Sequence, residues 1–311
     1  MNMVKIVLTA LMLPLVFVSC QKDPEKFIEN KPPKVDAGKD TTIELTKLSN
    51  SIQLSGISSD TDGTVVGYIW SQVSGPNESI IVSPGSANTL VKGLEVGNYV
   101  FQLMAVDDKG ATGVNSVSVN VLAPKVFTVN LNPTDNPNET VINSVEVGNN
   151  DRLQELPPSY WTNGGSSVET RALLKFDLSN IPSGATIVSA KLSLYAVPNP
   201  VNGDGVHAHS GSNNAVDIRR IATNWSTSNL SWANQPATSQ ANQVELPSTS
   251  NSSQDYINLN VTDLIQDMVS NGNYGMMLQL KDLTLYNIQN FASSKHADAS
   301  KHPKLVVEYS N

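Results

Sequence analysis

The sequence predicts an all-β protein made of two β-sandwich domains. Short runs rich in valine, isoleucine and threonine recur every 8–12 residues or so, roughly the spacing typical of sandwich strands, with turn-forming residues between them. The chain has 311 residues, enough for about two domains of ~100–200 residues each. Ala123-Pro124 is a short linker between them. We therefore expect one sandwich over residues 32–122 and a larger jelly-roll sandwich with one short helix over residues 125–311.

The first 20 residues have the pattern of a signal peptide. A short basic start ends at Lys5, an apolar run extends over residues 6–18, and Ser19 precedes Cys20. That order of segments is typical of secretory signals. The apolar run is too short to span ~30 Å of hydrocarbon, which takes about 20 residues. Residues 1–20 are therefore predicted to be a signal peptide, and residues 21–31 a tether to the first domain.

Cys20 is the only cysteine in the chain. The string Phe17-Val18-Ser19-Cys20 resembles a bacterial lipoprotein lipobox, with Phe17 in place of the usual leucine. The resemblance implies a lipid on the Cys20 thiol and a protein anchored at the outer membrane or cell surface. Gln21 is not the aspartate that retains some lipoproteins at the inner membrane, which favours the outer membrane. The alternative is plain secretion, with a cysteine at this position by chance.

The composition excludes some classes of function. The formal net charge is −8 and no segment is a basic block, so the footprint of a nucleic-acid-binding protein is absent. The sequence has no Gly-x-Ser-x-Gly, no His-Glu-x-x-His and no cysteine nucleophile, which are common catalytic signatures. We therefore expect a monomer that is not an enzyme and does not bind nucleic acid. The one cofactor that the sequence suggests is structural calcium.

In the first domain, residues 117–121 alternate apolar and polar side chains, as a half-buried strand should. Strands are predicted at Thr41–Leu45, Val65–Val73, Tyr99–Val106 and Val114–Val121. Turn-rich segments of Ser, Asp, Gly and Pro separate them, as in a sandwich.

Five strings in this region, in order, resemble the PKD family. They are Pro33–Asp40, Ser58–Thr64, Tyr68–Pro76, Gly97–Leu103 and Val106–Ala111. The family is an immunoglobulin-like sandwich used outside cells as a spacer or adhesion module, so the resemblance implies that fold for residues 32–122. Trp70 is then expected in the core of a central strand rather than on a ligand platform.

The second domain is predicted to form antiparallel strands with a buried inner face. Over residues 171–178, Ala172 and Leu174 share one side and Arg171 and Leu173 the other. The alternation over residues 187–196 places four side chains inside, namely Val188, Ala190, Leu192 and Leu194.

One helix is predicted in this domain, over Asp263–Ser270, with Thr262 as its N-terminal cap. Lys304–Tyr309 is predicted to be the closing strand.

The second domain resembles the DNRLRE family over nearly its whole length. The matching strings are Arg171–Leu178, Ile181–Ile187, Ala190–Tyr195, Trp225–Pro236, Asn260–Leu264, Phe291–Lys295 and His302–Leu305. The family is related to carbohydrate-binding modules first recognised as alginate binders. The resemblance therefore implies a jelly roll that binds polysaccharide, with alginate or another acidic glycan as the expected ligand.

Sugar sites present aromatic planes beside polar groups, and Tyr160-Trp161 is the candidate platform. The pair follows Pro157-Pro158 and precedes Asn163-Gly-Gly165, in a predicted loop without core periodicity. The alternative is a loop anchor that plugs the edge of its own domain. Trp225 and Trp232 lie inside a family string and are interpreted as mainly structural.

Four cations are candidates for contacts with the carboxylates of an acidic sugar, since bidentate guanidinium–carboxylate pairs are strong. They are Arg152, Arg171, Lys175 and Arg219. Arg219 and Arg220 are consecutive in a strand and point to opposite faces, so at most one can face a given groove.

Two further patterns are candidate metal sites. His207-Ala-His209 could place two imidazoles on one side of a strand, but its glycine-rich flanks favour solvated loop histidines. Asp60 and Asp62, in the string Asp60-Thr-Asp-Gly63, offer oxygens suited to calcium, and so does Asp107-Asp-Lys-Gly110. Neither string has the full calcium-loop pattern, and a hydrogen-bonded turn is the alternative.

These observations favour a lipid-anchored surface protein whose first domain holds a polysaccharide-binding domain away from the membrane. Exposed aromatic side chains beside a groove would support that function. A structural or adhesion protein that binds protein or matrix is the first alternative. A polysaccharide lyase or hydrolase is the second, and it would need Tyr, His and Arg together in one cleft.

Overall fold

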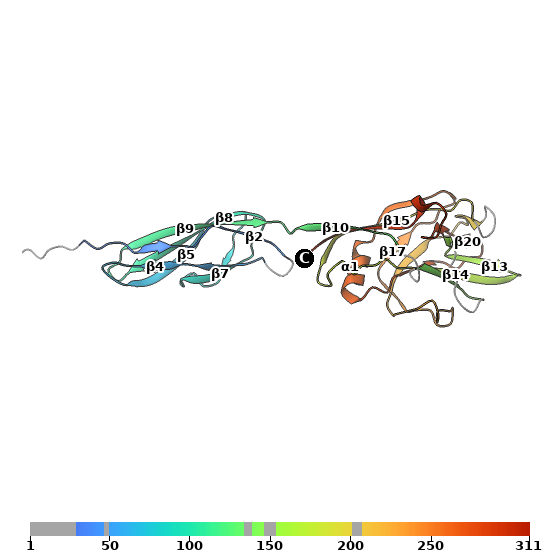
Figure 1. The fold of residues 1–311 in the computed structure, drawn as a ribbon, viewed down its shortest axis with the longest axis horizontal. Helices are drawn as coiled ribbons and strands as arrows, with labels where there is room; N and C mark the ends of the chain where they lie inside the picture. Colours follow the sequence, from blue (N-terminus) through green and yellow to red (C-terminus); the bar gives the residue numbers. More distant parts are fainter. Residues whose placement is uncertain (1–28, 47–49, 134–138, 146–153, 201–206) are drawn as a thin grey trace, which may run out of the picture.

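The computed structural model describes residues 29–46, 50–133, 139–145, 154–200 and 207–311. Two β-rich domains lie one after the other along the long axis of the molecule (Figure 1). Within the described ranges, no helix is long and apolar enough to cross a membrane. The signal peptide, Cys20 and most of the predicted tether lie outside these ranges.

The first domain is an immunoglobulin-like β-sandwich, as predicted. Its strands are β1 (Lys34–Asp36), β2 (Thr41–Glu44), β3 (Ile52–Ser55), β4 (Ile57–Ser59), β5 (Val65–Ser74), β6 (Ile80–Ile81), β7 (Asn88–Lys92), β8 (Gly97–Asp107) and β9 (Thr112–Leu122). One sheet has the order β2-β9-β8-β5 and the other β3-β7-β6, while β1 pairs with β4. The alternating residues of β8 and β9 supply much of the core between the sheets.

Trp70 lies in this core, which confirms the prediction. Its side chain is 2% exposed, and its indole N–H donates to the carbonyl of Ala87 at 3.1 Å. Leu103 is its direct partner across β5 and β8. A Cβ atom at Gly56 would overlap Leu103 and lie 3.3 Å from the Trp70 ring. A glycine at position 56 therefore makes room for the packing of Trp70.

Three residues connect the two domains, because β9 ends at Leu122 and β10 (Val126–Leu131) begins the second domain. The backbone N–H of Lys125 donates to the Glu44 carboxylate at 2.6 Å, and Leu45 donates to the Leu122 carbonyl at 3.0 Å. These bonds tie the connection to the end of the first domain. Independent folding of residues 32–122 and 125–311 stays a prediction.

The second domain is a sandwich of two main sheets, as predicted, and its described residues form one α-helix. Its other strands are β11 (Glu139–Asn143), β12 (Glu155–Leu156), β13 (Ser159–Asn163), β14 (Ser166–Leu174), β15 (Thr186–Leu194), β16 (Val216–Ile221), β17 (Thr238–Leu246), β18 (Tyr256–Asn260), β19 (Met276–Leu280), β20 (Asn287–Ile288), β21 (Phe291–Ala292) and β22 (Lys304–Ser310). The small sheet has the order β10-β22-β15-β18, and the large sheet β17-β16-β19-β14-β13-β20 with β11 also paired to β14. The main core lies between these sheets and includes Ala172, Leu174, Leu192 and Leu194.

One inward residue was predicted wrongly. Val188 is 50% exposed, whereas Ile187 is buried. The register of β15 against β22 shifts between Ile187 and Ser189. A bulge adds a residue to one strand and so reverses the side to which the next side chain points. The alternation is restored from Ala190 onward.

The helix α1 (Thr262–Asn271) is confirmed, but the predicted cap is wrong. Val261 precedes the first turn, and no side chain caps it. The Thr262 hydroxyl instead accepts from the backbone N–H of Ala190 at 3.0 Å and donates to Asn260 at 2.7 Å. The hydroxyl therefore ties the helix to β15. The helix packs Leu264, Ile265 and Met268 into the main core.

A smaller apolar cluster covers the outer face of the large sheet. Leu173, Ile142 and Met277 project to this side, and the loop between β16 and β17 packs Trp225, Leu230 and Trp232 over them. The placement of Leu173 opposite Ala172 and Leu174 agrees with the predicted alternation of β14.

Candidate functional site

Tyr160 and Trp161 were predicted to lie in a loop, but the structure places them on a strand. They belong to β13, where Tyr160 is opposite Glu169 and Trp161 opposite Val168 on β14. Gly164 and Gly165 form the hairpin turn with φ angles of 60° and 86°, a conformation that favours glycine. The Tyr160 ring packs against the main core, whereas the Trp161 ring has other neighbours.

Trp161 packs against two aromatic rings that come from distant parts of the chain. The Tyr286 ring meets it edge-on, with centroids 5.2 Å apart, and the His207 ring lies at 4.8 Å with a tilt of 45°. We call Trp161, His207 and Tyr286 the Trp161 cluster. Trp161 is half-buried, while Tyr286 is 53% exposed. The cluster therefore presents aromatic surface to solvent.

Tyr286 is held in an unusual backbone conformation. Its φ is 68°, in the left-handed region that a bulky residue rarely adopts. Its N–H donates to the Tyr160 carbonyl at 2.8 Å, which fixes the turn against β13. Backbone strain at a non-glycine residue is concentrated at functional sites. The strained residue here is also the most exposed member of the Trp161 cluster.

The sequence did not point to Tyr286, and it suggested for His207 a solvated loop histidine or a metal ligand. More than a hundred residues separate Trp161 from Tyr286, so no local pattern links them. The sequence offered one signal, because three apolar or aromatic residues lie within one short segment: Leu283, Leu285 and Tyr286. The structure shows that all three side chains are exposed.

The structure does not bring Arg171 or Arg219 to the Trp161 cluster. The Arg171 guanidinium bonds Glu169 at 2.7 Å and Gln235 at 2.9 Å, and it stacks 4.7 Å above the Trp232 ring. Arg219 bonds Asp217 at 2.7 Å and Gln243 at 3.0 Å. Both guanidiniums therefore already contact a carboxylate of the same domain.

The same holds for Lys175, the third of the predicted cations. Lys175 follows the far end of β14, seven residues beyond Val168, or roughly 23 Å at ~3.3 Å per residue. Arg152 lies outside the described residues. Glycan contacts by Arg152, Arg171, Lys175 and Arg219 stay a prediction.

The pair His207 and His209 is not the solvated pair that its flanks suggested. His209 is 3% exposed. Its Nε2 lies 3.0 Å from the Gln254 carbonyl, and its Nδ1 accepts from the backbone N–H of Asn290 at 2.9 Å. Both nitrogens of His209 are thus used within the protein, which leaves neither for a metal ion.

The buried His209 predicts a pH-dependent stability. Burial lowers its pKa below the usual 6.5, and protonation would place a second N–H against the Asn290 donor. The unfolded state takes up the proton near pH 6.5. The contribution of neutral His209 to the free energy of unfolding is therefore complete above pH 6.5. It falls as the pH drops from there through the folded-state pKa. The total loss is about 1.4 kcal/mol for each unit by which the pKa of the folded state lies below that of the unfolded state.

Thermal melts between pH 7.5 and 5.5 measure this effect. We expect the melting temperature of the wild type to fall over this range more steeply than that of His209→Gln, and His207→Gln to keep the wild-type slope. Parallel slopes for the wild type and His209→Gln would contradict the assignment.

Two family models match the chain, each over one domain. The model described as K319L-like, PKD domain matches residues 37–121. The model of carbohydrate-binding module family 96 matches residues 159–309. The chain contains a PKD domain and a family 96 carbohydrate-binding module. Neither matched family is a catalytic one.

Relatives of the PKD domain are parts of much longer animal proteins. The chain is 41% identical over 92 residues to the mouse dyslexia-associated protein KIAA0319-like protein, and the match covers 30% of this chain and 9% of that protein. It is 31% identical over 94 residues to human low-density lipoprotein receptor-related protein 11, and this match covers 30% of this chain and 18% of the human protein. The chain therefore spans less than a fifth of these curated relatives.

Solved structures similar to the chain include both kinds of module. The solution structure of the PKD domain from KIAA 1837 protein is 32% identical and covers 30% of this chain and 91% of its own, with a TM-score of 0.27. A structure of carbohydrate-binding modules from the β-sandwich superfamily, described as promiscuous in specificity, covers 91% of this chain and 92% of its own. Its identity is 15% and its TM-score 0.24.

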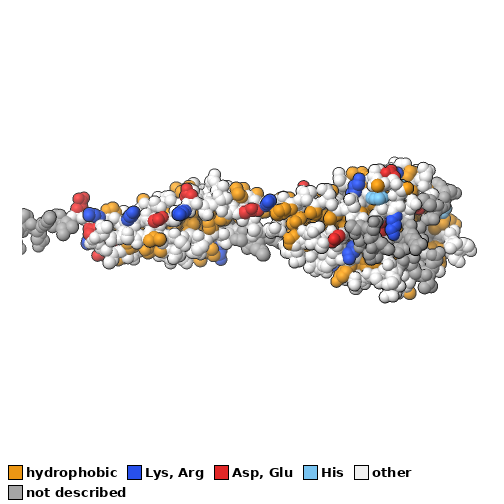
Figure 2. All heavy atoms as spheres, viewed as in Figure 1, with side chains coloured by type: hydrophobic (Ala, Val, Ile, Leu, Met, Phe, Trp, Pro, Cys, Tyr) orange, Lys and Arg blue, Asp and Glu red, His pale blue; other side chains and the backbone are white. Residues whose placement is uncertain are grey.

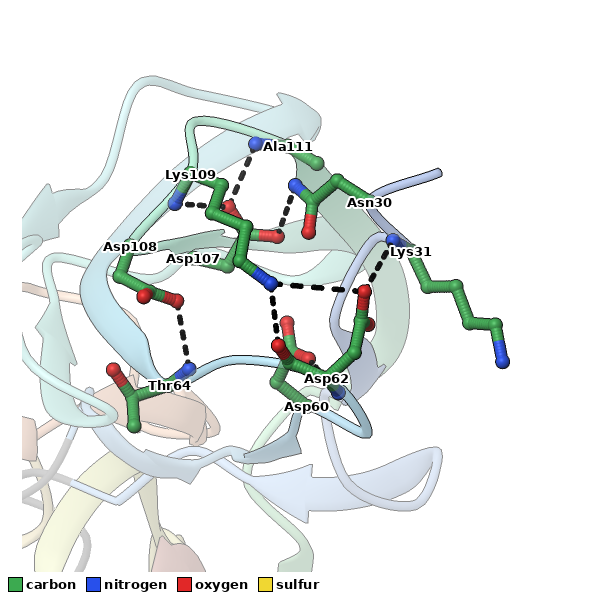
Figure 3. A network of polar contacts seen from close by, with 9 residues as sticks. All are labelled: Asn30, Lys31, Asp60, Asp62, Thr64, Asp107, Asp108, Lys109 and Ala111. Carbon is green, nitrogen blue, oxygen red and sulfur yellow. Dashed lines mark hydrogen bonds and ion pairs between the residues drawn. The ribbon is translucent and has the colours of Figure 1, made fainter. Parts of the chain in front are cut away.

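Asp60 and Asp62 of the PKD domain lie in a network with Asn30, Asp107 and Lys109 (Figure 3). Asp107 accepts from the backbone N–H groups of Lys109 and Ala111 at 2.9 and 2.8 Å. Its other oxygen accepts from Asn30 at 2.9 Å. These hydrogen bonds lower the pKa of the Asp107 carboxyl against the opposing effect of burial, which is the largest single influence on it.

The same network contains oxygens that suit calcium and a cation that competes for them. One buried oxygen each of Asn30, Asp60 and Asp62 has no hydrogen-bond partner, and carboxylate and amide oxygens are calcium ligands. The Lys109 ammonium, however, donates to the Asp62 carbonyl and lies 3.8 Å from its carboxylate. Among the described residues, no group of three or more His, Cys, Asp or Glu is arranged to hold a metal ion. Calcium at Asp60 and Asp62 stays a prediction.

Proposed function

We propose that this protein is a lipid-anchored, non-catalytic surface protein that binds polysaccharide through the Trp161 cluster. The PKD domain serves as the spacer between the anchor and the carbohydrate-binding module. The observation that carries the proposal is the exposed Tyr286, held in a strained conformation against Trp161. The family 96 match supplies the class of ligand.

An aromatic cluster suits a sugar for a physical reason. One face of a sugar ring carries C–H groups that pack on an aromatic plane, while its hydroxyls need hydrogen-bond partners. Tyr286 offers such a plane with its hydroxyl at the rim. The neighbouring hairpin adds polar side chains, Thr162 and Asn163. The predicted partner Tyr160 serves instead to hold β13 on the core.

Alginate or another acidic glycan is the ligand expected from the family resemblance, and a neutral polysaccharide is its competitor. On the face in Figure 2, acidic and basic side chains are interspersed along the described parts of both domains. Arg171 and Arg219 are already paired with Glu169 and Asp217. A polyanion would have to displace those carboxylates, so the argument for an acidic ligand rests on the resemblance alone.

Affinity electrophoresis of the protein in gels that contain alginate, pectin or a neutral glucan, with and without calcium, tests the proposal. We expect retardation by at least one glycan. Trp161→Ala and Tyr286→Ala should each weaken binding by about 2 kcal/mol, or about thirty-fold, as for residues that dominate an interface. Tyr195→Ala, at the end of a strand in the other sheet, is the control and should leave binding unchanged. Retardation by no glycan would contradict the proposal.

Adhesion to another protein is the second candidate, and one observation favours it. Ile69, Met104 and Val114 form a row across β5, β8 and β9, and Ile69 and Val114 are 48% and 56% exposed. Apolar side chains in a row on an exposed sheet face are a feature of protein-binding surfaces. Failure of every glycan to bind would favour this function.

The anchor is tested separately. Cys20→Ser removes the thiol that would carry the lipid, so we expect the variant to leave the membrane fraction for the soluble fraction of bacterial cells. Ser19→Ala, which keeps a small residue before the cysteine, is the control. A Cys20→Ser variant that is processed normally and stays with membranes would contradict lipid anchoring.

A further inference from the structure

A cavity of about 220 Å³ lies in the loop between β16 and β17, apart from the Trp161 cluster. It is lined by Asn224, Trp225, Ser226, Asn229, Leu230 and Asn234. At ~30 Å³ per water molecule, this volume holds about seven waters. That is room for about one sugar ring with its hydroxyls.

The loop that forms this cavity is firmly held. The Trp225 indole N–H donates to the Tyr274 carbonyl at 2.7 Å, and Leu230 is buried in the outer apolar cluster. Asn234 accepts from the backbone N–H and the hydroxyl of Ser231, both at 2.6 Å, and donates to the Asn229 carbonyl. The cavity is therefore preformed, and binding would not have to order the loop.

The lining combines the two chemistries that a sugar ring requires. The half-buried Trp225 supplies apolar surface for the C–H face of the ring. The side-chain amides of Asn224 and Asn229 form no hydrogen bond to any described residue and are exposed. Each free amide offers a carbonyl acceptor and two N–H donors, which can pair with neighbouring hydroxyls.

The charge of the lining limits the ligand class. None of the six lining residues is ionisable, so a carboxylate or sulfate group would find no counter-charge on the wall. A carboxylated sugar would lose part of its hydration without compensation. An uncharged sugar unit is therefore the ligand that fits.

The cavity and the Trp161 cluster lie at opposite ends of the large sheet. Trp161 is opposite Val168 near the start of β14, whereas Ile221, where the loop begins, bonds Gly275 beside the end of that strand. Leu174, the last residue of β14, is six residues from Val168, or roughly 20 Å along the strand. One sugar ring cannot contact both places.

We infer that this cavity is a second carbohydrate site, which takes a single uncharged sugar unit such as a chain end or a branch. The inference rests on the proposed function only for the class of ligand. Two sites on one module would let it hold a polysaccharide at two points, and the second contact would form at high effective concentration.

The four tryptophan indole N–H signals in a ¹H–¹⁵N spectrum of the protein, assigned by Trp→Phe variants, separate the two sites. The probes are glucose, galactose, mannose and fucose, each titrated to high millimolar concentration. We expect one of them to shift the Trp225 signal in a saturable way. Asn229→Ala and Asn224→Ala should each weaken that response about five-fold, as for the loss of one hydrogen bond.

The control is Asn88→Ala, an exposed asparagine of the PKD domain, which should leave the response unchanged. No saturable shift of the Trp225 signal with any sugar would overturn the inference. A shift of the Trp161 signal alone would overturn it as well, while supporting the proposed function. Equal weakening in Asn88→Ala would show that the response is not specific to the cavity and would also overturn it.

Discussion

Trp70→Ala is expected to destabilise the PKD domain by about 3–5 kcal/mol, the range for removing a large aromatic side chain from a packed core. The ring is 2% exposed and packs between the two sheets of the sandwich. Typical domains are stable by only about 5–15 kcal/mol. The substitution therefore removes a large part of the stability of this domain.

Two effects add in this variant. The truncation leaves a cavity that the rigid β-strands cannot fill. It also removes the indole donor at 3.1 Å, so the Ala87 carbonyl keeps only the Gly56 backbone N–H at 2.9 Å. Gly56 offers no side chain that could move into the space. Relaxation around the site is therefore small, which favours the upper part of the range.

Differential scanning calorimetry and hydrogen exchange over residues 34–122 measure the loss. Ile69→Ala is the matched control, because Ile69 is the neighbour of Trp70 on β5 but is 48% exposed. It should cost well under 1 kcal/mol, as most exposed substitutions do. Glycan binding by the second domain should survive Trp70→Ala. An unchanged melting temperature would show that the ring does not stabilise the domain.

The alternation of apolar residues predicted the sandwich core well, because a strand has a fixed period of two. Ala172, Leu173 and Leu174 lie on the faces that the pattern assigned. Val188 was predicted wrongly because a bulge depends on the register with β22, which the strand's own sequence does not encode. Thr262 was predicted to cap a helix, but its hydroxyl found a tertiary partner, Ala190.

The candidate site was less predictable than the fold. Trp161 could be chosen from its local composition, but its partners come from distant segments. The pairing of β13 with β20 brings up Tyr286, and the bridge between Ser210 and Ile288 brings up the segment of His207. The charges of Arg171 and Arg219 were correctly noticed, yet the acidic residues that pair with them, Glu169 and Asp217, lie two positions away on the same strands. A pattern of period two would have warned that these side chains share a face.

Asn214→Ala is expected to destabilise the carbohydrate-binding module by about 3 kcal/mol or more, a loss comparable to that of Trp70→Ala. Asn214 is 0% exposed, and its amide N–H₂ group donates to the carbonyls of Ser210, Thr249 and Ile288 at 2.8–2.9 Å. Its side-chain oxygen accepts from the Thr249 N–H at 2.9 Å. Alanine would remove the partners of the Thr249 N–H and carbonyl and leave the Ser210 and Ile288 carbonyls with only each other's backbone N–H, at 3.1 Å. Each hydrogen bond that water does not replace costs about 1–3 kcal/mol.

The same change should also weaken glycan binding, because Asn214 holds the segment that carries Tyr286. Ile288 lies in β20, which pairs with β13, and Tyr286 is two residues before it. Loss of the Ile288 contact would free Tyr286 to leave its strained conformation.

Asn213→Ala is the matched control, since that neighbour is exposed and its amide donates only to Asp282, at 3.2 Å, among the described residues. Urea denaturation and affinity electrophoresis of the two variants measure both effects. A module that keeps its stability in Asn214→Ala, or that loses it equally in Asn213→Ala, would show that this buried amide does not hold the loops together.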